Sequence, residues 1–190
     1  LTGVVSDLYA RYPKSTWFSA GVYATEAWSI NDQTTVTSGL RASAVGLDAD
    51  FTSNLPYFPL PFSTARVRDQ AVTGSLGLTY RPTADWVVKV NVGTAFRAPN
   101  VDDMGKFFDS SPGMLVVPNA DLKSEYAYNA DVDVAKLIGT WLKVDVAAYA
   151  TWLQNALVRR PFQLGGQDSV LYDGAMSRVE AIQNAAQARV

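Results

Sequence analysis

Residues 86 to 97 alternate strictly between two kinds of side chain, and this alternation limits what the chain can fold into. The even positions from Trp86 to Phe96 are apolar or small, whereas Lys89, Asn91 and Arg97 occupy odd positions. Successive side chains of a β-strand point to opposite faces of the sheet. The segment is therefore predicted to be a strand with one apolar face and one polar face.

The same two-residue period recurs in other segments. Even positions are again mainly apolar in residues 18–28, 34–44, 70–80, 126–134 and 142–152. We therefore predict an all-β fold, an antiparallel meander of hairpins with about seven strands. The strands are expected at residues 16–29, 33–47, 68–81, 85–97, 124–137, 140–153 and 170–187. The alanine-rich residues 181–188 are also compatible with a helix.

The connections between these strands alternate between short and long. Short connections with turn residues lie at 30–32, 82–85 and 138–139. Long connections lie at about 48–67, 98–122 and 154–167, and the first two are rich in proline, which is excluded from central strands. Short turns on one side and long loops on the other are typical of transmembrane β-barrels of the outer membrane.

Strand length and aromatic placement also indicate a membrane wall. From Trp86 to Phe96 a strand rises about 33 Å, and a tilt near 45° reduces this to about 24 Å, close to the apolar band of an outer-membrane barrel. Aromatic residues flank the apolar stripes at both ends: Trp28, Tyr80, Trp86 and Trp141 near short connections, and Phe18, Phe96, Tyr126 and Trp152 near long ones. We predict a partial transmembrane β-barrel with its even face toward lipid; a soluble antiparallel sheet is the alternative.

The composition excludes several function classes. The net charge is −2 and no basic patch is present, so a nucleic-acid partner is not expected. The chain has no Cys and no His, which excludes disulfides, thiolate or histidine metal sites and histidine acid–base catalysis within it. No nucleophile with a neighbouring base is evident, so we predict neither an enzyme nor a resident metal or cofactor. Residues 1–14 lack the features of a signal peptide, and we expect a fragment of an exported protein.

Two motifs flank the second long connection. Residues 93–100 read GTAFRAPN, and residues 118–125 read PNADLKSE. In this order they resemble the F-R-A-P-N and N-P-D-L-K-P-E motifs of TonB-dependent outer-membrane receptors, with Ala120 and Ser124 where that family usually has proline. The resemblance covers residues 69–190 well and the first 68 only by pattern. The matching positions are Phe96, Arg97, Ala98, Pro99, Asn100, Asn119, Asp121, Leu122 and Glu125.

The resemblance implies a barrel segment, residues 1–190, of an active importer in the outer membrane of a Gram-negative bacterium. Its partners would be outer-membrane lipid, a small-molecule metal chelate, and the receptor's own N-terminal plug domain and the TonB complex, neither of which lies in this chain. A ferric siderophore is the expected ligand. A haem or cobalamin receptor of the same family and a passive porin are the alternatives, and the absence of His excludes histidine ligation of haem from this segment.

Ligand contacts are expected in the long loops, where aromatic and charged residues occur together. A second interpretation is that these side chains pack the loops against one another. For Arg97 we favour a lumen residue neutralised by Glu125 or Asp131 over a direct ligand contact. The candidate ligand-binding residues are Tyr57, Phe58, Arg97, Asp102, Asp103, Lys106, Phe107, Phe108 and Met114.

Overall fold

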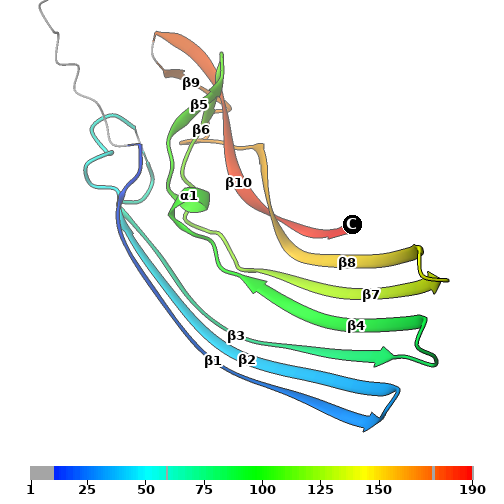
Figure 1. Ribbon diagram of the computed structural model, residues 1–190. Coiled ribbons are helices and arrows are strands. Elements are labelled where there is room, and N and C mark those ends of the chain that lie inside the picture. The colour runs from blue at the N-terminus through cyan, green and yellow to red at the C-terminus, as the bar shows by residue number, and fades with distance from the viewer. Residues whose placement is uncertain (1–10, 59, 173, 190) are drawn as a thin grey trace, which may run out of the picture.

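The computed structural model describes residues 11–58, 60–172 and 174–189, which form an open, curved sheet of 10 strands (Figure 1). One short helix, α1 (Val101–Met104), interrupts the strands. The strands are β1 (Lys14–Asn31), β2 (Thr34–Asp50), β3 (Thr64–Tyr80), β4 (Trp86–Arg97), β5 (Phe108–Ser111), β6 (Met114–Val116), β7 (Glu125–Ile138), β8 (Leu142–Pro161), β9 (Ser169–Tyr172) and β10 (Ala175–Arg189).

The sheet is an antiparallel meander, as the alternating sequence predicts. Its order is β1-β2-β3-β4-β7-β8-β10, and each neighbouring pair in this series is antiparallel. Beyond β10 the order continues through β6 to β5, with β6 parallel to β10, and β9 pairs antiparallel with β10. Strand β1 is exposed along its whole length, so the sheet is not closed within this chain.

The register places the two kinds of side chain on opposite faces. Val22 pairs with Ala42, and Ala42 pairs with Val72, so even residues lie side by side across the strands. We call the face formed by the even-numbered residues of β1 to β4, β7 and the first part of β8 the even face, and the opposite one the odd face. Val22 and Val72 are each 73% exposed. The predicted apolar stripe is thus continuous from strand to strand, and no other part of the described residues covers it.

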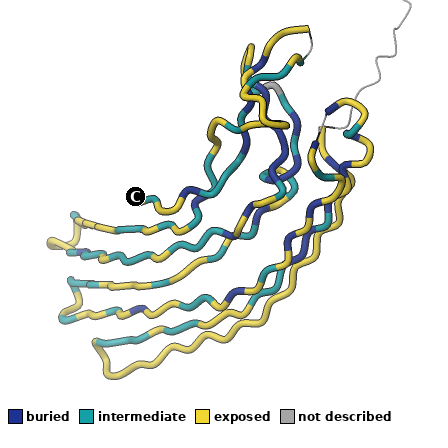
Figure 2. Tube along the Cα trace, turned by 180° about the vertical axis from the view of Figure 1, so that it is seen from behind, coloured by how far each residue is buried: buried dark blue, intermediate teal, exposed yellow. Residues whose placement is uncertain are grey.

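Buried residues concentrate at the end of the sheet that carries the long connections (Figure 2). There the odd face of β2 and β3 is covered by residues of the loops and of β6 and β10. We call this cluster the loop core; its largest side chains include Phe51, Phe58, Met104, Phe107 and Leu115, all 7% exposed or less. The loops therefore pack on the odd face, which leaves the even face uncovered.

The structure corrects three details of the predicted strands. Strand β8 runs to Pro161 because its last residues pair with β10, so most of the expected loop at 154–167 is strand. The connection at 98–122 contains α1 and the β5–β6 hairpin. The expected strand at 170–187 is two strands, β9 and β10, that pair with each other, and residues 181–188 are strand and not helix.

Phe96 of β4 lies beyond the point where β3 and β4 stop pairing. The β3–β4 ladder extends from the pair Tyr80–Val88 to the pair Ser75–Gly93. The ends of β3 and β4 nearest the long loops are therefore not paired with each other. Phe96, near the end of β4, lines a hollow with odd-face residues of β1 and β2, among them Trp17 and Ser43. Its ring also packs against that of Tyr126, its ladder partner on β7, with ring centroids 5.3 Å apart. Among the described residues, no helix is long and apolar enough to span a membrane.

Candidate functional site

The first motif builds a capped helical turn directly after β4. The Asn100 side chain accepts a hydrogen bond from the Asp103 N–H, and the Asp103 carboxylate accepts one from the Asn100 N–H, which is a capping box. The Arg97 guanidinium donates to both Asp103 carboxylate oxygens at 2.8 Å. Arg97 is thus neutralised by an ion pair, as expected, but the partner is Asp103 instead of Glu125 or Asp131, because α1 folds back over the end of β4.

The second motif, residues 118–125, binds the segment that leads into β7 to β8 and β10 through hydrogen bonds. The Asn119 amide donates to the Ile182 carbonyl at 2.8 Å, and the Asn119 N–H donates to the Met104 carbonyl at 3.0 Å. Glu125 accepts a hydrogen bond from the Leu157 N–H at 2.9 Å. Because these partners are backbone groups of this chain, Asn119 and Glu125 act by holding the loop against the sheet.

Asn184 of β10 joins three segments at the same place. Its side chain accepts from the Lys123 N–H and donates to the carbonyls of Lys123 and Asn155 at 2.8 and 2.7 Å. Asn155 has a φ of 55°, a left-handed conformation that asparagine tolerates better than most residues. These contacts lie at the irregularity of the β8–β10 ladder, whose pairs pass from Ala156–Ala185 to Gln154–Gln187 and leave Asn155 unpaired in it.

Several candidate ligand residues lie inside the loop core. The Phe58 and Phe107 rings are stacked with centroids 4.1 Å apart and planes 15° apart. Phe107 is 0% exposed and Phe58 is 7% exposed, so both rings pack loops together. Tyr57 is 47% exposed, and Met114 lies in β6, opposite Arg178 of β10.

Cationic side chains surround the ring of Phe108 at the start of β5. Lys106 Nζ lies 4.9 Å from the ring centroid, and the guanidinium carbons of Arg11 and Arg159 lie 5.0 and 5.6 Å from it. These are cation–π distances. We call Arg11, Lys106, Phe108 and Arg159 the cation cluster; its members come from the N-terminal segment, the α1–β5 connection, β5 and β8.

Acidic side chains partly offset this charge. Lys106 Nζ donates to Asp102 at 2.9 Å, and the Tyr12 hydroxyl donates to the same carboxylate at 2.9 Å. The hydrogen bond from Lys106 is the largest cause that lowers the pKa of Asp102 below its ordinary value. Arg159 lies 3.8 Å from the Glu180 carboxylate. Three cations face two carboxylates, so the cluster keeps a positive surplus.

At the cation cluster the structure brings together three of the predicted ligand residues, Asp102, Lys106 and Phe108. Elsewhere it pairs Arg97 with Asp103 and stacks Phe58 on Phe107. Sequence reasoning missed Arg11, Tyr12 and Arg159. The Arg159–Arg160 doublet is visible in the sequence, but no local signal links residues 11 and 12 to a loop about a hundred residues away. Among the described residues, no three acidic side chains gather as a metal site.

Comparison with protein families gives one match over almost the entire chain. A family model described as "TonB dependent receptor-like, beta-barrel" matches residues 2–190. A search of curated proteins gave no match.

Solved structures with the same fold include a hemophore receptor, a copper transporter and a ferric enterobactin receptor. The hemophore receptor HasR of Serratia marcescens, in complex with its hemophore HasA and heme, has a TM-score of 0.69 at 14% identity over 94% of this chain. The copper transporter OprC has a TM-score of 0.67 at 16% identity over 92%. The ferric enterobactin receptor PfeA of Pseudomonas aeruginosa has a TM-score of 0.52 at 15% identity over 92%. This chain covers 31%, 24% and 32% of those three chains, respectively.

Proposed function

Because this chain belongs to the TonB-dependent receptors, in their β-barrel region, we propose that the protein carrying it imports a ferric siderophore across the outer membrane. Members of this family are receptors and transporters of the Gram-negative outer membrane and are not enzymes. The chain spans about a quarter to a third of the structures it matches. The plug domain, the TonB complex and outer-membrane lipid are the proposed partners of the whole protein, and residues 1–190 form part of its wall.

The observation that carries the siderophore proposal is the cation cluster. A ferric catecholate complex is anionic and presents aromatic rings, so it is complementary to a phenyl ring surrounded by ammonium and guanidinium groups. Arg159 is 45% exposed and Lys106 is 19% exposed in their side chains, so both groups are accessible from the loop end. The ion pair between the motif residue Arg97 and Asp103 of α1 supports this site indirectly, since it positions α1 and the segment that presents Lys106 and Phe108.

Haem, cobalamin and copper are the competing ligands of receptors with this fold. HasR is a heme-related neighbour and OprC is a copper transporter, so the fold alone does not select among them. The absence of His removes the usual haem ligand from this segment, and Met104 is fully buried in the loop core. The positive surplus at Phe108 favours an anionic chelate. The family match also favours a receptor over a passive porin.

The test is a titration of the receptor that carries this chain, purified in detergent. Ferric enterobactin, haemin and cobalamin are added in parallel, and binding is followed by tryptophan fluorescence. The ferric siderophore is expected to bind more tightly than the other two. Tight binding of cobalamin or haemin alone would overturn the proposal.

A pair of neighbouring variants locates the site. Arg159→Ala removes a guanidinium group from the Phe108 ring and is expected to weaken siderophore binding about five- to thirtyfold, which corresponds to about 1–2 kcal/mol. Arg160→Ala is the matched control, because successive strand residues point to opposite faces. An equal effect of the two substitutions would contradict a site at the cation cluster.

A further inference from the structure

The segment before β1 brings a cation to the loop end from a distant part of the chain. Arg11 belongs to the cation cluster, and the next two residues, Tyr12 and Pro13, contact α1 and the residue that follows it. We propose that the contact between Pro13 and Gly105 positions the Arg11 guanidinium group, so that these two residues control how tightly the cation cluster binds an anionic chelate. This inference rests on the proposed function, in which the cation cluster binds the siderophore.

Pro13 and Gly105 approach so closely that a side chain at position 105 does not fit. A Cβ atom on Gly105 would lie 2.8 and 2.9 Å from two carbons of the Pro13 ring. Carbon atoms attract each other at about 3.5–4.0 Å, and the closed proline ring cannot rotate away. Gly105 has a φ of −123°, a negative value that residues with side chains adopt, so the close approach and not the backbone conformation requires glycine here. Pro13 is buried, although Tyr12 and Lys14 on either side are exposed.

Two hydrogen bonds hold the same segment. The Phe107 N–H donates to the Arg11 carbonyl at 2.9 Å, and the Tyr12 hydroxyl donates to the Asp102 carboxylate at 2.9 Å. The Phe107 ring is fully buried in the loop core, so the main chain of Arg11 is tied to a fixed point. Each of three consecutive residues thus contacts α1 or the connection that follows it. These contacts place the Arg11 guanidinium carbon 5.0 Å from the centroid of the Phe108 ring.

Arg11 supplies the positive surplus of the cation cluster. Lys106 forms an ion pair with Asp102, and Arg159 lies 3.8 Å from the Glu180 carboxylate. Arg11 forms no ion pair with a carboxylate of the described residues. Without Arg11, the two remaining cations would face two carboxylates, and the attraction for an anionic chelate would fall.

The test is a double-mutant cycle on the receptor that carries this chain, purified in dodecyl maltoside. Gly105→Ala displaces the Pro13 ring and is expected to weaken the binding of ferric enterobactin about five- to thirtyfold, the range also expected for Arg11→Gln. Both substitutions remove the same cation from the site, so the double variant is expected to match Arg11→Gln within about twofold. High salt screens the Arg11 charge, so both losses are expected to shrink as the salt concentration is raised. Losses that multiply in the double variant, or that do not depend on salt, would overturn the proposal.

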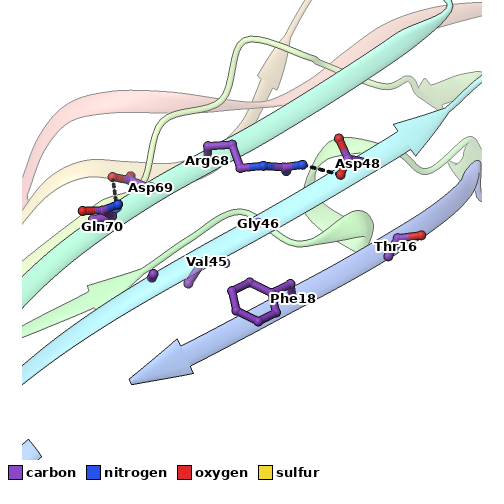
Figure 3. Close-up of a pocket in the computed structure, with 9 residues that line it drawn as sticks. Thr16, Phe18, Val45, Gly46, Asp48, Arg68, Asp69 and Gln70 are labelled. Carbon is purple, nitrogen blue, oxygen red and sulfur yellow. Dashed lines mark hydrogen bonds and ion pairs between the residues drawn. The ribbon is translucent and has the colours of Figure 1, made fainter. Parts of the chain in front are cut away.

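Arg68→Gln is the matched control for Arg11→Gln. Arg68 lies in a hollow of about 620 Å³ across β1, β2 and β3, and its guanidinium group is bound to Asp48 (Figure 3). This arginine is outside the cation cluster, so its loss is expected to leave siderophore binding within about twofold of the wild type. Equal losses in Arg68→Gln and Arg11→Gln would contradict a specific role for Arg11.

Pro13→Gly tests the contact from its other side. A Cβ atom on Gly105 would also lie 3.1 Å from the Val101 carbonyl oxygen, so Gly105→Ala alone does not separate the Pro13 contact from a change within α1. Pro13→Gly removes the ring and leaves α1 intact, and it is expected to weaken ferric enterobactin binding in the same range. Pro56→Gly, at an exposed proline of the β2–β3 connection, is expected to stay within about twofold of the wild type. Wild-type affinity in Pro13→Gly would overturn the proposal.

Limited digestion with trypsin reports the position of this segment without a ligand. Release of Pro13 exposes the peptide bond after Arg11, so cleavage there is expected to be at least about tenfold faster in Gly105→Ala than in the wild type. Cleavage after Lys123, in the second motif, is the internal reference and is expected not to change. Equal cleavage rates at Arg11 would overturn the positioning role, even in a receptor that binds the siderophore. Faster cleavage at Arg11 in a receptor that binds no siderophore would uphold the positioning of Arg11 and contradict the proposed function, so the two failures are distinguishable.

Discussion

At the residue scale, side chains that look like ligand contacts in the sequence serve to hold the loops. Arg97 follows a strand and precedes a long loop, which is where a binding residue would be expected, yet its guanidinium group is bound to Asp103. Asn119 and Asn184 bond backbone groups of neighbouring segments. The motif residues Arg97 and Asn119 therefore determine how the loop leaves and re-enters the sheet, and we propose that Lys106 and Arg159 select the ligand.

The short turn before β4 contains an ion pair with a measurable pH dependence. Lys136 Nζ donates to the Asp85 carboxylate at 2.8 Å and also lies 4.4 Å from the centroid of the Trp86 ring. The hydrogen bond from Lys136, followed by the one from Thr83, lowers the pKa of Asp85 from 3.8 to about 2. Since the folded-state pKa is lower than the unfolded one, this stabilisation is present above about pH 4 and is lost as the pH falls toward about 2.

We predict that Asp85→Asn lowers the unfolding temperature at neutral pH, and that this difference from the wild type shrinks as the pH falls from about 4 to 2. Thermal unfolding in detergent, followed by tryptophan fluorescence, measures the difference. Asp32→Asn, in the neighbouring short turn, is the control for loss of a turn carboxylate. A difference that is independent of pH across this window would contradict the role of the ion pair.

At the scale of elements, the loops are held by an apolar core of their own. Phe107, between α1 and β5, stacks on Phe58 from the connection between β2 and β3. Burial of both rings joins segments that are about fifty residues apart in the sequence. The loop core, rather than the strands, determines where the cation cluster lies.

Phe107→Ala is expected to destabilise this loop packing by about 3–5 kcal/mol, the usual cost of truncating a buried phenylalanine. The strand ladders do not depend on this ring, so we expect the loops to become at least about a hundredfold more susceptible to limited proteolysis while the sheet persists. Tyr57→Ala, at a side chain that is 47% exposed, serves as the comparison. Similar cleavage rates for the two variants would contradict a structural role for Phe107.

The period of two predicted the strands because it is a local property of the chain. Strand β4 was expected at 85–97 and is observed at Trp86–Arg97. The parallel pairing of β6 with β10 joins residues about sixty positions apart, and no pattern inside either segment encodes it. The cation cluster was only partly predictable for the same reason: Lys106 and Phe108 share a loop, whereas Arg11 and Arg159 reach it through the tertiary fold.

At the scale of the whole molecule, the sheet has two unlike faces. The loops fold onto the odd face, and the even face carries an exposed apolar stripe. A bare stripe of this extent is unusual on a soluble protein and matches the lipid-facing wall of a barrel. We infer that the even face contacts lipid.

Fluorescence quenching by brominated lipid measures the contact between the even face and lipid. The chain has five tryptophans, and single-tryptophan variants retain either Trp152, on the even face, or Trp17, on the odd face. Their exposed fractions are nearly equal, 43% and 46%, so accessibility alone does not distinguish them. For the receptor in brominated phosphatidylcholine bilayers, we predict strong quenching of Trp152 and weak quenching of Trp17. Equal, weak quenching of both would contradict the membrane assignment.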